Sequence, residues 1–348
     1  MMRNRSPPSP PGESPDLILV PATASERIAS IKLNSVAWKG PLDVETYIER
    51  ENHLLQQRLT RDGLTCWILV DRNEPEDKRT ILSSCESYRK TALLAHNGQV
   101  EKVSTYGVGS VYCRPAFRGK GYAKRMLEEL SIKLETWEME KEPRRKSLFT
   151  VLFSDIGKKF YAQFGWRPFS SSHMSLPAAT GALENAVTRD LFAEDVHKCL
   201  CSETVLAKLR EQMRLASQKA SVKGAGDDQA RVYCAWNRNF GETPEDNVLY
   251  ILRWVYDDPA SPAEEQATVQ AMAAILRRAQ QEAHEWNMSK VEFWNPTPLL
   301  QKAVALVDPK AELVHREKES IASLRWTGEE QGLGKDVEWW LNEKYTWC

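Results

Sequence analysis

The sequence contains no long apolar run and almost no net charge. Of its 348 residues, 42% are hydrophobic and 27% are charged, and the formal net charge is −1. No stretch is long and apolar enough to span a bilayer, and residues 1–15 lack the apolar core of a secretory signal. A charge near zero argues against a nucleic-acid carrier or a polybasic membrane protein. We therefore expect neither a nucleic-acid partner nor a membrane partner.

Cysteines are few, and their spacing suits neither a metal site nor a redox site. There are seven, an odd number. The only close pair, Cys199 and Cys201, is separated by one residue, which fits neither a zinc knuckle nor a C-x-x-C motif. This pattern is typical of reduced thiols in a cytoplasmic protein, so we expect a cytoplasmic location and no bound metal.

The length indicates more than one domain, because 348 residues exceed the usual size of a single domain. Residues 1–16 are rich in proline and serine and predict a disordered tail, since such a segment buries too little surface to offset its ordering entropy. We assign residues 17–177 to a first, catalytic α+β domain and residues 178–225 to a helical connector. Residues 226–348 then form a second α+β domain.

Hydrophobic periodicity predicts a similar order of elements in both halves. In the first half, strands are expected at 17–20, 66–70, 80–95, 103–113 and 148–153, and helices at 25–38, 43–59, 123–140 and 158–164, with Asp43 as an N-cap. In the second half, strands are expected at 232–236, 248–256, 291–294, 321–326 and 339–347, and helices at 264–286 and 298–307. The second half thus repeats the order of the first without a visible sequence repeat.

A glycine loop, Arg118–Ala123, stands between a predicted strand and a predicted helix. Its two glycines can adopt conformations closed to other residues, and the helix that follows begins with unpaired amides. Such a loop can hold a pyrophosphate. By itself it is more often an ordinary turn beside a solvated basic helix face. It is not the G-x-G-x-x-G of a dinucleotide-binding fold, and it follows several strands instead of opening the fold.

The residues around the loop make the prediction more specific. The run Val111–Ala123, V-Y-C-R-P-A-F-R-G-K-G-Y-A, resembles the acetyl-CoA signature of the GNAT acetyltransferases. Phe160–Trp166 is similar to the aromatic motif of the same superfamily. The resemblance implies the GNAT acyl-CoA N-acyltransferase fold, a mixed and splayed central sheet flanked by helices. It also makes the second half a degenerate GNAT-like domain without a cofactor loop of its own, expected to line the amine pocket.

The resemblance also implies roles for individual residues. Acetyl-CoA would be the co-substrate, and the strand would be splayed by a bulge near Gly107 and Gly109. Backbone groups would bind pantetheine and the acetyl carbonyl, and an amide there would stabilise the oxyanion. Tyr161 would be the general acid that protonates the departing thiolate, although a core tyrosine is the alternative. The pantetheine residues are Val111, Tyr112 and Cys113, and those of the pyrophosphate loop are Arg118, Gly119, Lys120, Gly121, Tyr122, Ala123 and Lys124.

Further stretches are similar to one group within the superfamily, the fungal lysine N-epsilon-acetyltransferases. They are Ile81–Lys90, Phe153–Tyr161 and Asn342–Cys348. The resemblance implies transfer of acetyl to the ε-amine of free L-lysine in lysine catabolism. Acetylation of another small amine or of a protein lysine is an alternative within enzymes, and a non-catalytic CoA-binding module is the alternative outside them.

An amine acceptor requires a general base, since the ammonium of lysine has a pKa near 10.4 and is rarely deprotonated at neutral pH. Three carboxylates are candidates: Glu86, Asp155 and the C-terminal carboxylate of Cys348. For each of them an exposed surface carboxylate is the alternative. The last four residues are apolar and aromatic for a chain end, so we expect them to dock near the acetyl group.

Overall fold

The computed structural model describes residues 10–138, 147–180, 188–191, 193–200, 202–217, 232–327 and 337–347. The chain divides into two compact units. The first comprises residues 1–92, 103–168 and 322–337, and the second comprises residues 93–102, 169–321 and 338–348. None of the helices in the described ranges is long and apolar enough to cross a membrane.

The first unit is built on a seven-stranded mixed sheet with the order β1-β2-β3-β4-β5-β12-β6. Neighbours β1–β2, β2–β3 and β12–β6 are antiparallel, whereas β4 and β5 are parallel. The strands are β1 (Leu17–Pro21), β2 (Leu64–Asp71), β3 (Ser83–His96), β4 (Gln99–Cys113), β5 (Phe149–Ser154), β6 (Arg167–Pro168) and β12 (Ile321–Trp326).

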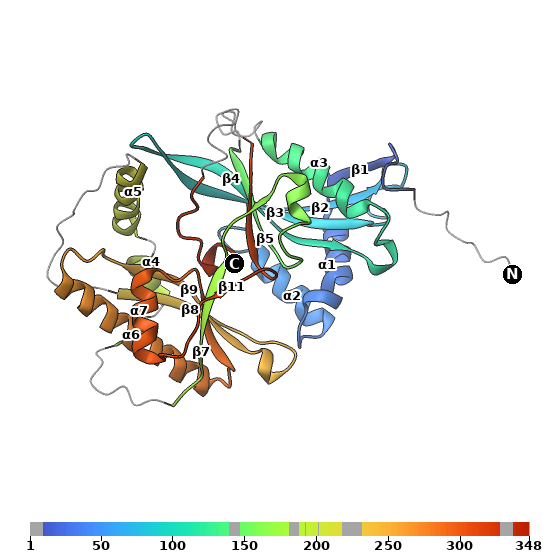
Figure 1. The fold of residues 1–348 in the computed structure, drawn as a ribbon. Helices are drawn as coiled ribbons and strands as arrows, with labels where there is room; N and C mark the ends of the chain where they lie inside the picture. Colours follow the sequence, from blue (N-terminus) through green and yellow to red (C-terminus); the bar gives the residue numbers. More distant parts are fainter. Residues whose placement is uncertain are drawn as a thin grey trace. The chain divides into compact units, whose positions relative to one another are not determined.

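Helices cover both faces of this sheet (Figure 1). On one face, α3 (Tyr122–Thr136) buries a helical stripe that includes Met126 and Leu130 among the core residues of β1–β5. On the other face, α1 (Ala24–Trp38) packs Leu33 against β1 and β2. The helix α2 (Val44–Leu55) contacts α1 and begins at the predicted N-cap, where the Asp43 side chain accepts a hydrogen bond from Thr46 N at 2.7 Å. The expected N-cap is confirmed.

The second unit is built on a five-stranded sheet with the order β11-β7-β10-β9-β8. The helices α6 (Pro262–Glu285) and α7 (Pro298–Val307) contact each other, and α6 packs on β8, β9 and β10. The remaining elements are β7 (Ser172–Pro177), β8 (Val232–Asn239), β9 (Val248–Tyr256), β10 (Lys290–Trp294), β11 (Val314–His315), α4 (Ala193–Leu200) and α5 (Glu203–Ser217).

Three expectations about the organisation of the chain differ from the structure. Residues 10–16 of the predicted tail are placed against the first unit, because hydrogen bonds and a close backbone contact hold them; residues 1–9 lie outside the described ranges. The strand β7 pairs in the second sheet and β12 in the first, so the sheets do not follow the boundaries at 177 and 226. Residues 339–347 form no strand; they contain only the short 3-10 helix η5 (Lys344–Thr346), whose side chains are bound to the second sheet.

Candidate active site

The glycine loop has the geometry of an anion site. Gly119 and Gly121 have φ values of 77° and 84°, in the left-handed region that favours glycine. Gly121 is the N-cap of α3, no side chain caps the helix there, and no acidic residue stands in the first turn. The first amides of α3 therefore keep their hydrogen-bonding capacity, and the helix dipole favours a negative charge at this end. These features fit the pyrophosphate of a CoA thioester.

The basic side chains of the loop are exposed and make only weak interactions with the rest of the protein. Arg118 donates from Nε to the carbonyl of Cys113 at 3.1 Å. Lys120 lies 5.5 Å from the centre of the Phe117 ring, and Lys124 is 3.9 Å from Glu128. All three predicted cationic residues can therefore turn toward a phosphate without breaking a buried ion pair.

The side chain of Tyr122 faces away from the predicted pyrophosphate site, which leaves its backbone amide for the predicted contact. Its side chain is 1% exposed and lies in the core, and its hydroxyl donates to the carbonyl of Pro10 at 2.6 Å. The amide of Gly12 donates to the Lys120 carbonyl at 3.2 Å. A Cβ on Gly12 would stand 2.5 Å from that same oxygen, closer than atoms pack. Residues 10–14 thus form an N-terminal segment that is fitted to the glycine loop.

The strand before the loop separates from its neighbour. The pairing of β4 with β5 runs from Thr105 to Val108. Beyond Val108, β4 continues to Cys113 with no partner on β5 among the residues that the structure describes. Ser110 has a φ of 52°, and a left-handed residue interrupts the pleat as in a β-bulge. The open edge includes the predicted pantetheine residues Val111, Tyr112 and Cys113.

The two glycines expected to form the bulge are not left-handed; they make room for side chains of β3. A Cβ on Gly107 would lie 3.2 Å from Lys90 Cε, and one on Gly109 would lie 3.2 Å from Tyr88 Cε2. The bulge conformation falls on the next residue, Ser110. Gly107 thus leaves room for the flexible end of Lys90 and Gly109 for the ring of Tyr88, and the change of direction occurs immediately after them.

Glu86 is fixed beside this bulge. Its Oε2 accepts hydrogen bonds from the Tyr88 hydroxyl and from Ser110 Oγ, both at 2.6 Å. Burial, with the nearby charge of Glu86, raises the pKa of Tyr88, which therefore remains a donor at neutral pH. Tyr88 was not predicted, although its position two residues after Glu86 on one strand places both on the same face. No feature of the sequence predicted a role for Ser110.

The other predicted catalytic residues are Tyr161, Asp155 and Cys348. Tyr161 begins the 3-10 helix η2 (Tyr161–Phe164), is 9% exposed, and belongs to the core cluster that also contains Cys85. Burial, followed by the charge of Asp155, raises the pKa of Tyr161. Asp155 is exposed just after β5. Cys348 lies outside the described residues, as do the contacts predicted for its carboxylate.

The segment before Cys348 is bound tightly within the second unit. Glu343 accepts a hydrogen bond from the amide of Trp254 at 3.1 Å and also pairs with Arg253. Lys344 is 5% exposed, and its Nζ lies over three aromatic rings. The distances to the ring centres are 3.5 Å for Trp347, 4.3 Å for Trp294 and 4.5 Å for Tyr250.

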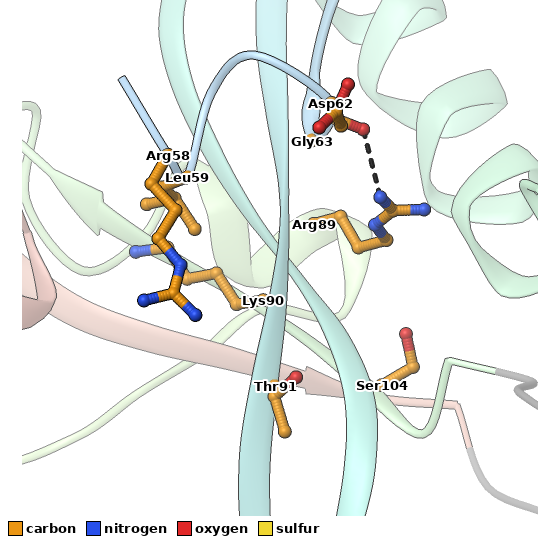
Figure 2. A pocket seen from close by; sticks show the side chains of 8 residues that line it. All are labelled: Arg58, Leu59, Asp62, Gly63, Arg89, Lys90, Thr91 and Ser104. Carbon is orange, nitrogen blue, oxygen red and sulfur yellow. Dashed lines mark hydrogen bonds between the residues drawn. The ribbon is translucent and has the colours of Figure 1, made fainter.

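A surface pocket of about 250 Å³ opens elsewhere on the first unit (Figure 2). None of the predicted site residues lines it. Arg89 bridges one side, donating to the Asp62 carbonyl at 3.0 Å and pairing with Glu138 at 3.3 Å. Its lining is polar and more basic than acidic, and consists of Arg58, Leu59, Asp62, Gly63, Arg89, Lys90, Thr91 and Ser104. Within the described residues, no cluster of side chains is suited to hold a metal ion.

Comparison with known proteins relates the chain to acyltransferases. Residues 210–348 match the family model described as the LYC1 GNAT-like C-terminal domain. An uncharacterised protein of Saccharomyces cerevisiae is 27% identical over 170 residues, 41% of this chain and 41% of that protein. A lysine acetyltransferase of Yarrowia lipolytica is 27% identical over 142 residues, 37% of this chain and 35% of that protein. The similarity thus spans about two fifths of the length of these relatives.

Solved structures share the architecture. The N-myristoyltransferase of Saccharomyces cerevisiae with bound myristoyl-CoA has a TM-score of 0.51 at 11% identity, covering 92% of this chain and 81% of that one. A GCN5-related N-acetyltransferase from Kribbella flavida has a TM-score of 0.50 at 14% identity, covering 89% of this chain and 71% of that one. At such identities the likeness concerns the fold alone. The chain has the α+β GNAT fold that its sequence predicts.

Proposed function

We propose that this chain is an N-acetyltransferase that uses acetyl-CoA and acetylates the ε-amine of free L-lysine. The observation that carries the proposal is the splayed end of β4. A buried carboxylate, Glu86, is tied there to the left-handed residue Ser110. The same strand leads into an uncapped helix N-terminus with two left-handed glycines. Together these features provide a place for a thioester and a base for an amine.

Each group has a defined role in the transfer. Glu86 accepts the proton that the acceptor ammonium must lose before its nitrogen bonds to the acetyl carbon. The open backbone edge at Val111–Cys113 binds the pantetheine arm and the acetyl oxygen. Tyr161 donates its proton to sulfur as the carbon–sulfur bond breaks, and the second proton that the nitrogen loses restores the Tyr161 hydroxyl. The raised pKa of Tyr161 keeps its proton in place at neutral pH before that step. The exposed cations Arg118, Lys120 and Lys124 hold the pyrophosphate.

The choice of acceptor rests on sequence likeness. The stretches Ile81–Lys90 and Phe153–Tyr161 are similar to the fungal lysine acetyltransferases, and one of the matched relatives bears that name. They also contain Glu86, Tyr88 and Tyr161. A sheet face with the Glu86 carboxylate suits a cationic amine better than a neutral or anionic acceptor.

The test is CoA release from acetyl-CoA by the full chain with L-lysine, polyamines and lysine-containing peptides as acceptors. We expect turnover with L-lysine above all others. Glu86→Gln should lower kcat by about 100-fold or more, since general bases contribute on that order. The exposed Asp155→Asn should change kcat less than threefold. Binding of acetyl-CoA without turnover on any amine would instead favour a non-catalytic CoA-binding module.

A further inference from the structure

The two faces of the five-stranded sheet differ in chemistry. One face is apolar and packs in the core with α6 and α7, through residues that include Leu249 and Phe293. On the other face, alternation along the strands collects polar side chains. Ser175 on β7 stands opposite Glu292 on β10, and His173 stands opposite Trp294. This polar face has no catalytic role in the proposed reaction.

Arg316 is buried on this face with no ion-pair partner among the described residues, although the charge of Glu292 acts on it from a longer distance. The residue follows β11, is 8% exposed, and its Cζ lies 4.0 Å from the centre of the Trp294 ring. Nη2 makes one long hydrogen bond, 3.4 Å, to the Ser320 carbonyl. Nε and Nη1 are buried and find no acceptor, and no carboxylate in the described ranges forms an ion pair with this guanidinium.

An unpaired buried cation is costly, and arginines in protein interiors are ordinarily paired. Burial lowers the pKa of Arg316 to about 10, so the guanidinium is still charged at neutral pH. The Trp294 ring offsets only part of the cost of burying the charge. A cation–π contact gives no hydrogen-bond acceptor to the N–H donors, which lie in the plane of the guanidinium. The missing partner is therefore an anion with oxygen acceptors.

Two neighbouring polar groups share this lack of partners. Ser175 Oγ and His173 Nδ1 are buried and unpaired in the same way. Burial lowers the pKa of His173; the charge of Glu292 acts to raise it and the charge of Arg316 to lower it. The net shift is downward, so the imidazole is neutral near pH 7 and can donate one hydrogen bond. Glu292, opposite Ser175, binds Lys290 Nζ at 2.7 Å and Trp294 Nε1 at 3.2 Å, one on each oxygen. Each oxygen keeps a lone pair.

We propose that this face binds a free amino acid, with the carboxylate held by Arg316, Ser175 and His173 and the α-ammonium by Glu292. That the amino acid is L-lysine rests on the proposed function. A guanidinium and two hydrogen-bond donors match a carboxylate, and Glu292 matches the ammonium beside it. An acceptor without a carboxylate, such as a simple diamine, cannot use Arg316.

The test compares L-lysine with cadaverine, the same chain without its carboxylate, by calorimetric titration of the full chain. We expect the wild type to bind L-lysine about 10- to 100-fold more tightly, the range for hydrogen bonds to charged groups. Arg316→Gln should remove that advantage and leave cadaverine binding unchanged. Equal affinity of the wild type for both ligands, or a preference that survives Arg316→Gln, would overturn the inference.

A stability measurement separates binding from a structural role. Arg316→Met removes a buried, unpaired cation and keeps the volume, so we expect an unchanged or higher Tm without ligand. The matched control Arg238→Met, at an exposed arginine of the same unit, should leave the preference for L-lysine intact. A lower Tm, together with equal losses for both ligands, would make Arg316 structural. Arg316-dependent binding of L-lysine without acetyl transfer to any amine would uphold the inference and refute the proposed function.

Discussion

Single residues determine the chemistry of the first unit. Ser110 both breaks the pairing of β4 with β5 and donates to Glu86, so one residue couples the open strand edge to the candidate base. Burial keeps Tyr161 protonated, as a general acid requires. The sequence predicts Tyr161 from its place in an aromatic motif and Glu86 as one of three candidate carboxylates. It could not single out Ser110, because no local pattern marks a left-handed serine inside a strand.

A buried ion pair at the start of α1 predicts a pH-dependent stability. Glu26 accepts two hydrogen bonds from Arg79, each at 2.7 Å, and both side chains are buried. The hydrogen bond from Arg79 holds the pKa of Glu26 below its usual value of 4.5. A lowered pKa contributes stability that is present above pH 4.5 and is lost as the pH falls through the folded-state value.

We therefore expect Glu26→Gln to lower the free energy of unfolding by about 3 kcal/mol at pH 7, because it leaves Arg79 unpaired. The difference from wild type should shrink between pH 7 and an acidic pH below the lowered pKa of Glu26, where the carboxylate is protonated. Urea unfolding of both proteins at both pH values measures the difference in the free energy of unfolding. Glu128→Gln, in an exposed pair, should cost less than about 1 kcal/mol at either pH. A difference for Glu26→Gln that does not change with pH would contradict the assignment.

At the scale of elements, the glycine loop depends on the N-terminal segment, residues 10–14. The segment bonds to the loop at Lys120 and to α3 at Tyr122, and Arg125 reaches back to the carbonyls of Ser14 and Leu17. The composition of residues 1–16 predicted a disordered tail. That prediction is wrong for residues 10–16, because tertiary hydrogen bonds offset the entropy lost when these residues become ordered.

Gly12→Ala should raise the KM for acetyl-CoA by about 10-fold, since a shift of the loop that costs 1.4 kcal/mol weakens binding by that factor. The KM for the amine should change little. Steady-state kinetics with each substrate varied in turn measure both values. Gly241→Ala is the matched control: its Cβ would also clash, 2.2 Å from Asp246 Cβ, but in the other unit. An unchanged KM for acetyl-CoA in Gly12→Ala would show that the segment does not position the loop.

At the scale of the whole molecule, the chain returns to its first sheet after all five strands of the second. The strand β12 lies between β5 and β6, and it hydrogen-bonds within the sheet that contains β4, the strand before the glycine loop. Arg325 on β12 also binds Glu135 of α3 at 3.1 Å. The first unit therefore needs residues that are more than 150 positions away from β5.

A chain ending at Lys318 should lose the protection of β5 amides against hydrogen exchange, whereas a chain ending at Thr327 should keep it. Removal of β12 opens an edge of the sheet on β5, and unpaired edges exchange quickly. Hydrogen exchange with mass spectrometry measures the protection of the β5 amides in the two chains. Equal protection of β5 in both would show that β12 does not stabilise the first sheet.

The sequence by itself determined the elements, most of their bounds and the place of the glycine loop between a strand and a helix. These depend on local periodicity, on caps such as Asp43 and on glycines that permit left-handed conformations. Only the tertiary structure decided which strands share a sheet, that Tyr122 binds the N-terminal segment, and that Arg316 is buried with no ion-pair partner among the described residues. Pairing between distant segments and burial of a charge depend on contacts that no local pattern specifies, since the hydrogen bonds of a strand edge can be satisfied by any strand that reaches it.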